Sequence, residues 1–302
     1  MGTPFLSRQE RFPRIPSTND VVRAWLDEGT PEVCLAVADE QTAGRGRSGR
    51  TWVAPSGAAL LMSMGFRPTW LAPDRAWQLA ALASLAMADA AEEVAGLPDR
   101  AIRRKWPNDL VIEAVAGRAV AGPWRPGEEA REIRKLAGVL GETVGLGTDD
   151  PRVVVGLGIN AGWPADAFPA DLAATMTSLA AASGGRPIDL VFLLDAFLGR
   201  LEARVEALRA GRFDVADWTD RQLTTGRTVR LESGGPDSGG PNSGGAESRG
   251  PESGSPAAPT SEIVRALGVD PLTGALIVAD RFAVDGERSV LSGEIHHLRV
   301  EV

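Results

Sequence analysis

The chain has 302 residues, enough for two domains, and its 43% of hydrophobic residues exclude a globally disordered protein. A formal net charge of -8 argues against a general nucleic-acid binder, which usually carries a basic domain. A single cysteine, Cys34, excludes an internal disulfide, and two histidines without zinc-type spacing predict no transition-metal site built by the protein. The first residues lack an apolar signal segment, and the most apolar stretch, 79–88, is too short to span a bilayer. We therefore expect a soluble cytoplasmic protein without membrane contact.

The first expected element is a helix that begins near Ser17. Residues 17–20, STND, are typical of a helix N-terminus because short oxygen-bearing side chains can cap its free N–H groups. Gly29 is expected to end this helix. Further elements are predicted from the apolar pattern: strands at 33–38 and 59–66, a helix over 74–95, strands at 101–105, 110–113, 136–142 and 153–159, and helices over 188–209 and 213–223.

The composition changes abruptly at Glu232. Residues 232–261 are rich in Gly, Ser and Pro, cannot bury enough surface to offset their ordering entropy, and are predicted to be disordered. The β-like runs around them lie at 228–231, 263–269, 275–279 and 289–300. These runs predict a small C-terminal β-barrel whose first hairpin carries the insertion, and hence two domains, 1–225 and 226–302. Residues 114–131, where Gly, Pro and charges interrupt strand-like segments, are a second candidate insertion.

The sharpest local feature is QTAGRGRSGRTW, residues 41–52. Three glycines alternate with charged residues over 44–50, so no regular element is expected there. Glycines let a backbone approach a ligand closely, and Arg side chains match carboxylates and phosphates. The segment therefore favours a site for a small, multiply charged anion. A flexible nucleic-acid-binding tract or a solvated turn is the alternative, although such tracts usually lie in low-complexity surroundings and this one is bounded by a strand and Trp52.

Two strand ends add weaker signals. Lys105 ends a predicted strand and is followed by a rigid Trp-Pro turn that would hold its charge in place. A plain strand exit is an equally good interpretation of that segment alone. The run VVVGLGIN, residues 153–160, ends in Gly-x-Gly and Asn160, which brings the backbone close to another group; close strand packing would explain it by itself.

Taken together and in this order, STND, QTAGRGRSGRTW, KWPND, KLAGVLGE and VVGLGIN resemble the motifs of the biotin–protein ligase family. The resemblance covers residues 17–160 strongly and the C-terminal segments weakly, and GRGR-x-GR-x-W together with KWPND is highly specific. It implies an α/β (α+β) fold: a catalytic domain related to class II aminoacyl-tRNA synthetases, with a mixed, largely antiparallel sheet, and a small SH3-like C-terminal β-barrel. In such ligases the biotin carboxylate attacks the α-phosphate of ATP, and the ε-amine of a carrier-protein lysine then attacks the biotinyl-AMP.

The resemblance also implies roles for individual residues. The biotin site should be lined, near the ureido ring, by Ser17, Thr18, Asn19 and Gln41. The segment Arg45, Gly46 and Arg47 should close over the carboxyl group and the phosphate, and Lys105 should bond first the carboxylate and later the bridging phosphate. The residues expected to act in catalysis are thus Lys105, Arg47 and Arg45. The nucleotide is expected to contact Arg47, Arg50, Trp52, Lys105, Asn108 and Asn160.

A reaction between a carboxylate and ATP requires a cluster of cations in the site. Bringing a carboxylate up to a triphosphate forces anions together, so the Arg side chains, Lys105 and a Mg²⁺ ion should offset the repulsion. No residue is expected to ligate a metal as part of a dedicated site. The implied partner is a biotin carboxyl carrier protein or domain of a biotin-dependent carboxylase, bound by a monomer or homodimer. Because STND begins at Ser17, no room is expected for the N-terminal winged helix of repressor relatives, which predicts a ligase that does not bind DNA.

Three other interpretations stay open. A lipoate or octanoyl ligase on a related fold is the nearest, but Gln41 beside residues 17–19 favours a polar ureido ring over an apolar ring. A DNA-binding regulator that senses biotin or a nucleotide is disfavoured by the acidic charge. An inactive homologue is disfavoured by the retention of Arg45, Arg47 and Lys105.

Overall fold

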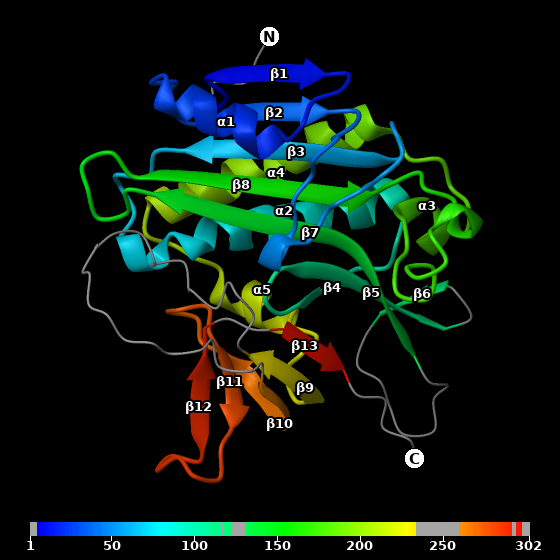
Figure 1. Ribbon diagram of the computed structural model, residues 1–302, viewed down its shortest axis with the longest axis vertical. Coiled ribbons are helices and arrows are strands. Elements are labelled where there is room, and N and C mark those ends of the chain that lie inside the picture. Colours follow the sequence, from blue (N-terminus) through cyan, green and yellow to red (C-terminus); the bar gives the residue numbers. More distant parts are fainter. Residues whose placement is uncertain (1–4, 116–117, 122–130, 234–259, 292–293, 298–302) are drawn as a thin grey trace, which may run out of the picture.

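The computed structural model describes residues 5–115, 118–121, 131–233, 260–291 and 294–297. They form a large eight-stranded sheet covered by helices and a separate five-stranded sheet (Figure 1). The strands of the large sheet are β1 (Arg8–Phe12), β2 (Cys34–Ala38), β3 (Ala59–Phe66), β4 (Ile102–Lys105), β5 (Asp109–Val115), β6 (Arg118–Val120), β7 (Glu132–Val144) and β8 (Arg152–Asn160). Their order is β1-β2-β3-β8-β7-β5-β4, with β6 paired to β5. Because β1 and β2 run parallel and the other pairs of this sheet run antiparallel, the expected mixed sheet is confirmed.

Helices cover both faces of the large sheet. They are α1 (Thr18–Asp27), α2 (Trp77–Ala95), α3 (Leu179–Ala182), α4 (Leu190–Arg209) and α5 (Val215–Asp220). In Figure 1, α1 lies in front of β2 and β3, and α2 and α4 lie behind the sheet. On β2, Cys34 and Ala36 pack with Trp25 of α1, whereas Leu35 and Val37 belong to the main core with α2 and α4. Burial on both faces explains why these strands appear in the sequence as unbroken apolar runs.

The apolar pattern located the central elements well. β3 begins and ends at the predicted residues, β2 begins one residue late, β8 extends one residue beyond the prediction at each end, and α4 begins two residues late. The helix predicted over 74–95 is α2 preceded by a 3-10 turn, Pro73–Arg75. The edge strand β1 was not predicted because its sequence, RQERF, carries charges and no apolar alternation. None of the helices in the described part of the chain combines the length and apolar character needed to cross a bilayer.

The small sheet is antiparallel and has the order β12-β11-β10-β9-β13. Its strands are β9 (Thr228–Ser233), β10 (Thr260–Val269), β11 (Leu276–Ala279), β12 (Glu287–Val290) and β13 (Glu294–His297). The single strand predicted over 289–300 is therefore two strands, as far as the described residues reach. β9 pairs with β10, so residues 234–259 connect two paired strands. The disorder predicted for 232–261 is wrong at its two ends, because Glu232 pairs with Ser261 and Ser233 with Thr260, and the rest of that prediction lies outside the described residues. A closed barrel and the boundary at 225/226 stay predictions.

The two sheets meet at a cluster of tryptophans. Trp77 of α2, Trp106 after β4 and Trp218 of α5 pack against Val229, Leu276 and their apolar neighbours of the small sheet. The indole Nε1 of Trp106 donates a hydrogen bond to the Gly274 carbonyl at 3.1 Å. The turn that follows Lys105 is therefore held against the small sheet by this hydrogen bond and by the packing of Trp106.

Candidate functional site

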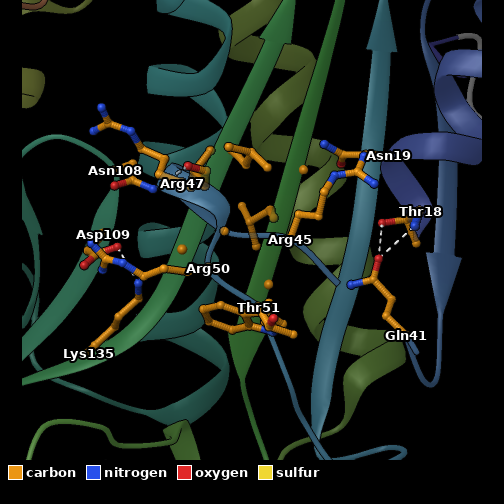
Figure 2. A pocket seen from close by; sticks show the side chains of 18 of the residues that line it. Thr18, Asn19, Gln41, Arg45, Arg47, Arg50, Thr51, Asn108, Asp109 and Lys135 are labelled. Atoms are coloured by element: carbon orange, nitrogen blue, oxygen red, sulfur yellow. Dashed lines mark hydrogen bonds and ion pairs between the residues drawn. The ribbon is translucent and has the colours of Figure 1, made fainter. Parts of the chain in front are cut away.

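A pocket lies on the face of the large sheet that α1 partly covers. Gly138 and Leu140 of β7 and Gly156 and Gly158 of β8 belong to its floor, and its walls come from α1, residues 41–52 and the turn after β4. Of the residues predicted from the sequence, those that line this pocket are Ser17, Thr18, Asn19, Gln41, Arg45, Gly46, Arg47, Arg50, Trp52, Lys105 and Asn108. Figure 2 shows two groups of side chains: Thr18, Asn19 and Gln41 on one side, and Arg47, Arg50, Asn108, Asp109 and Lys135 on the other. The pocket therefore has a neutral polar end and a charged end.

The polar end is built around the first turn of α1. Ser17 stands at the N-cap position but makes no side-chain capping bond; instead, the Thr18 N–H donates to Gln41 Oε1 at 2.8 Å. Ser63, from the middle of β3, has its Oγ 2.6 Å from Thr18 Oγ1 and 2.5 Å from Asn19 Oδ1. The predicted cap is thus supplied by a residue 23 positions further along the chain rather than by Ser17.

Asn19 presents an unused donor at this end. Its side chain is 4% exposed, and its Nδ2 has no hydrogen-bond partner. A side chain at position 156 could not share this space, because a Cβ there would lie 2.3 Å from Asn19 Oδ1. A buried amide donor without a partner costs free energy unless a ligand or water accepts its hydrogen bond. The polar end is therefore suited to a ligand with a carbonyl oxygen.

The charged end carries an excess of cations. Lys135 Nζ lies 2.7 Å from Asp109 Oδ1, and Lys105, Arg47 and Arg50 line the same region. Burial lowers the pKa of Lys105 from its ordinary value, and the nearby Asp109 carboxylate partly opposes that shift. Burial likewise lowers the pKa of Arg47. Four cations facing one carboxylate favour the binding of anions.

A β-bulge explains how Lys135 reaches the pocket. Asp109 is opposite Gly138 and Leu110 is opposite Ala137, but Val111 is opposite Lys135, so one residue of β7 is left over. Leu136 and Ala137, which are consecutive, both lie in the main core. The extra residue turns Lys135 to the pocket face, where strict alternation from Gly138 would have put it in the core. The backbone of Lys135 bonds instead to Thr175 and Thr177.

Trp52 lies flat against the glycines of the floor. A Cβ on Gly158 would be 2.7 Å from Cε2 of the indole, and a Cβ on Gly138 would be 3.2 Å from its Cζ3. Lys135 Nζ is 5.5 Å from the indole centroid, within the range of a cation–π contact. Glycine at 138 and 158 thus lets the aromatic ring lie directly on the sheet.

Two predicted residues are placed differently from expectation. Arg45 borders the pocket, but its guanidinium pairs with Asp20, at 2.7 and 2.9 Å, and with Glu142, at 3.4 Å. Asn160 is fully buried at the end of β8, is not among the residues that line the pocket, and donates from Nδ2 to the Thr177 carbonyl at 3.0 Å. Within 44–50, Arg47–Gly49 form a single 3-10-like turn, but Ser48 at its centre has φ 55° and ψ 40°, so the segment holds no regular helix or strand, as the sequence predicted.

The residues that build this pocket lie within a known family domain. Residues 11–160 match the model of the biotin/lipoate A/B protein ligase family. The chain belongs to this family. The family match includes α1, the 41–52 loop and the strands β3, β5, β7 and β8 on which the pocket is built.

Curated relatives agree with the family assignment. The chain is 33% identical over 170 residues to the bifunctional ligase/repressor BirA of Bacillus spizizenii, a match that covers 56% of this chain and 45% of that protein. It is 33% identical over 206 residues to the biotin–acetyl-CoA-carboxylase ligase of Mycobacterium tuberculosis, covering 67% of this chain and 66% of the relative. The chain thus spans about half to two thirds of the length of these relatives.

Solved structures show the same fold over nearly the whole chain. The biotin protein ligase from Aquifex aeolicus, in complex with biotin and ATP, has a TM-score of 0.66 at 22% identity and matches 97% of this chain and 99% of its own. A biotin protein ligase from Leishmania major, in complex with biotinyl-5-AMP, has a TM-score of 0.53 at 20% identity and matches 94% of this chain. At such identities the likeness establishes the fold alone.

Three residues of the site were missed by sequence reasoning: Asp109 and Lys135, which line the pocket, and Ser63, which is buried behind its polar end. Asp109 and Lys135 were quoted within the motifs KWPND and KLAGVLGE without a role, whereas the bulge and the pairing of the two side chains place both in the pocket. Ser63 is the one hydroxyl in the apolar strand ALLMSMGF and is fully buried. A lone hydroxyl within a buried strand was the signal available for Ser63, because such a group needs a hydrogen-bond partner.

Proposed function

We propose that the chain is a biotin–protein ligase that forms biotinyl-5'-AMP from biotin and ATP and transfers the biotin to a lysine of a carrier protein. The two-ended pocket carries this proposal. A ureido ring, with one carbonyl and two N–H groups, suits the polar end, where the buried Asn19 Nδ2 is a free donor beside the polar side chains of Thr18 and Gln41. A lipoyl or octanoyl chain would leave the buried Asn19 Nδ2 without a partner, which favours biotin over the alternative of a lipoate or octanoyl ligase.

The charged end suits the reacting groups. The biotin carboxylate attacks the α-phosphorus of ATP, the bond to the β-phosphate oxygen breaks, and pyrophosphate leaves. Lys105, Lys135 and Arg47 would offset the repulsion between the anions and stabilise charge that develops on the phosphorus and the leaving group. An amine of the carrier lysine, once deprotonated, would then attack the mixed anhydride and release AMP. Trp52 and the 44–52 loop would keep water from the anhydride.

Mg²⁺ is proposed as a partner of ATP rather than as a resident metal. Among the described residues, no three His, Cys, Asp or Glu side chains gather in a way that could hold a metal ion. Mg²⁺ that acts on nucleotides usually takes one or two carboxylates and the substrate phosphates. Asp109, the carboxylate among the pocket-lining residues, fits this requirement. When bound, the ion would neutralise phosphate charge.

The wider assignments follow from the same proposal. The acceptor would be a biotin carboxyl carrier protein or domain, the enzyme would act in the cytoplasm as a monomer or homodimer, and Arg50 and Asn108 would contact the nucleotide. The polypeptide would consist of a catalytic domain of the class II aminoacyl-tRNA synthetase type and an SH3-like barrel. The assignment of Asn160 to the adenylate side has less support, since its side chain lies outside the pocket.

Isotope exchange tests the reaction directly. Purified protein with Mg²⁺, ATP and labelled pyrophosphate is expected to incorporate label into ATP when biotin is present, and not with lipoate or octanoate. Exchange with lipoate or octanoate alone would keep the adenylation chemistry and overturn the substrate. A folded protein that shows no exchange with any of the three acids would contradict the proposed reaction.

Ser63→Ala is expected to raise the KM for biotin roughly tenfold with a smaller change in kcat. Loss of the hydroxyl leaves Asn19 Oδ1 and Thr18 Oγ1 with one fewer buried partner, and each unsatisfied group costs about 1–3 kcal/mol. Ser84→Ala is the matched control, because Ser84 is also buried but bonds to the Ala81 carbonyl of its own helix. An unchanged KM in the exchange assay for Ser63→Ala would show that this hydroxyl does not order the polar end.

A further inference from the structure

A closed ring of charges joins the 44–52 loop to the two elements beside it. Arg45 of the loop bonds to both carboxylate oxygens of Asp20 on α1, at 2.7 and 2.9 Å, and lies 3.4 Å from Glu142 of β7. Arg23, one turn further along α1, lies 3.1 Å from Asp20 and 2.5 Å from Glu142. These four residues, here named the Arg45 latch, contain two cations and two carboxylates and are balanced in charge.

The guanidinium in the latch belongs to Arg45, which the family resemblance had assigned to the biotin carboxyl group and the phosphate. Both terminal nitrogens of Arg45 are bonded to carboxylates, and Figure 2 shows its side chain directed toward Asn19 rather than toward Arg47. The hydrogen bond from Arg45 lowers the pKa of Asp20 from its ordinary value, and the same bond raises the pKa of Arg45. In this arrangement the Arg45 guanidinium pairs with Asp20 and Glu142 of the protein itself, while Arg47 lines the charged end of the pocket.

The backbone hydrogen bonds of the loop are internal, so its attachment to the rest of the protein comes from side chains: Trp52 on the floor and the latch at Arg45. Gly46 N–H donates to the Arg50 carbonyl at 2.6 Å, and Trp52 N–H donates to the Gly44 carbonyl at 2.9 Å. These bonds shape the loop without fixing it over the floor. The latch attaches it to α1, which carries Thr18 and Asn19, and to β7, which carries Lys135, so one contact aligns the loop with both ends of the pocket.

We propose that Asp20 and Glu142 are positioning residues that hold the 44–52 loop closed over the pocket through Arg45. Neither carboxylate is among the residues that line the pocket, so neither is expected to touch substrate. Their effect on biotin and its adenylate rests on the proposed function, whereas their effect on the loop does not.

Trypsin measures loop closure without any substrate, because the loop itself contains Arg45, Arg47 and Arg50. In the full chain without ligands, Asp20→Asn and Glu142→Gln are each expected to be cleaved in the loop roughly five times faster than the parent. Asp27→Asn is the matched control: Asp27 lies on the same helix and pairs with Arg152 of β8, not with the loop. Loop cleavage of both test variants at the rate of Asp27→Asn would overturn the proposal.

Two further measurements separate the latch from a general loosening of the fold. Arg45→Gln is expected to speed cleavage after Arg47 and Arg50, and adding Asp20→Asn should cause little further increase if the two residues act as a pair. Fully additive effects would contradict the pairing. In the exchange assay, the test variants are expected to raise the KM for biotin. In a separate assay of AMP formation from biotin and ATP, they are expected to release AMP without a carrier several times faster than Asp27→Asn. If the parent protein shows no exchange activity, the proposed function is contradicted. The rates of tryptic cleavage would still test whether Asp20 and Glu142 hold the loop closed.

Discussion

Replacing Lys135 by alanine is expected to lower biotin-dependent pyrophosphate exchange by roughly 10²- to 10³-fold while leaving the fold intact. The bulge in β7 aims this side chain into the pocket, where its ammonium lies 2.7 Å from Asp109 and the side chain is 30% exposed. A positive charge at that point favours the transition state more than the ground state, because charge grows on the phosphoryl oxygens during attack. The loss should therefore appear mainly in kcat.

The neighbouring residue in β7 supplies the control. Arg134 carries the same charge and pairs with Glu132, but it is not among the pocket-lining residues, so Arg134→Ala is expected to retain exchange activity. Lys105→Ala and Arg47→Ala are also expected to lose activity with the fold intact, as the sequence predicts. Normal exchange by folded Lys135→Ala would remove Lys135 from the anion site, and normal exchange by folded Lys105→Ala would do the same for Lys105.

The sequence predicted the interior of the fold better than its edges. Strands such as β3, ALLMSMGF, are buried on both faces and leave a run that is apolar except for Ser63 and that defines their ends. The strand β1, RQERF, is held by backbone bonds to β2 and has mostly exposed side chains, so no hydrophobic pattern marks it. β1 can be predicted only if its pairing with β2 is known, and the sequence of β1 itself does not indicate that pairing.

The candidate site was predictable where a motif stays local. The glycine- and arginine-rich loop was assigned to an anion site from residue types alone, the Lys105 turn was assigned to it through the family resemblance, and both line the pocket. Lys135 was missed because a one-residue bulge reverses the side-chain direction, and no sequence period records it. The role of Arg45 depends on Glu142, 97 residues away, which spacing arguments cannot connect.

The largest expected change in stability comes from the buried charge cluster behind β4. The Arg221 side chain is 3% exposed and bonds to Glu92 at 2.9 and 3.1 Å, to Asp89 at 2.5 Å and to Asp217 at 3.2 Å. Burial by itself would lower the pKa of Arg221, but the hydrogen bond to Glu92 and the surrounding carboxylates outweigh burial and raise it. The carboxylates around Arg221 therefore favour its charged guanidinium more in the folded protein than solvent does in the unfolded chain.

Arg221→Met is expected to lower the free energy of unfolding by about 3–5 kcal/mol, because it leaves the buried Glu92 carboxylate without its cation. Urea titration followed by circular dichroism measures the loss. Arg288→Met, which removes the half-exposed pair with Glu262, should cost about 0–1 kcal/mol. A loss for Arg221→Met no larger than that of the control would show that the cluster does not stabilise the fold.

Arg221→Met is also expected to lower the exchange activity, because Arg221 contacts the strand that carries Lys105. The Arg221 guanidinium donates to the Ile102 carbonyl of β4 at 2.9 Å, and this contact is lost in Arg221→Met, whereas the backbone carbonyl of residue 221 still accepts the N–H of Arg104 at 2.7 Å. β4 ends in Lys105, whose ammonium belongs to the charged end of the pocket. Below the unfolding transition, Arg221→Met is therefore expected to lower exchange activity several-fold although Arg221 is not among the residues that line the pocket. Unchanged activity in the folded variant would mean that β4 holds Lys105 without help from the charge cluster.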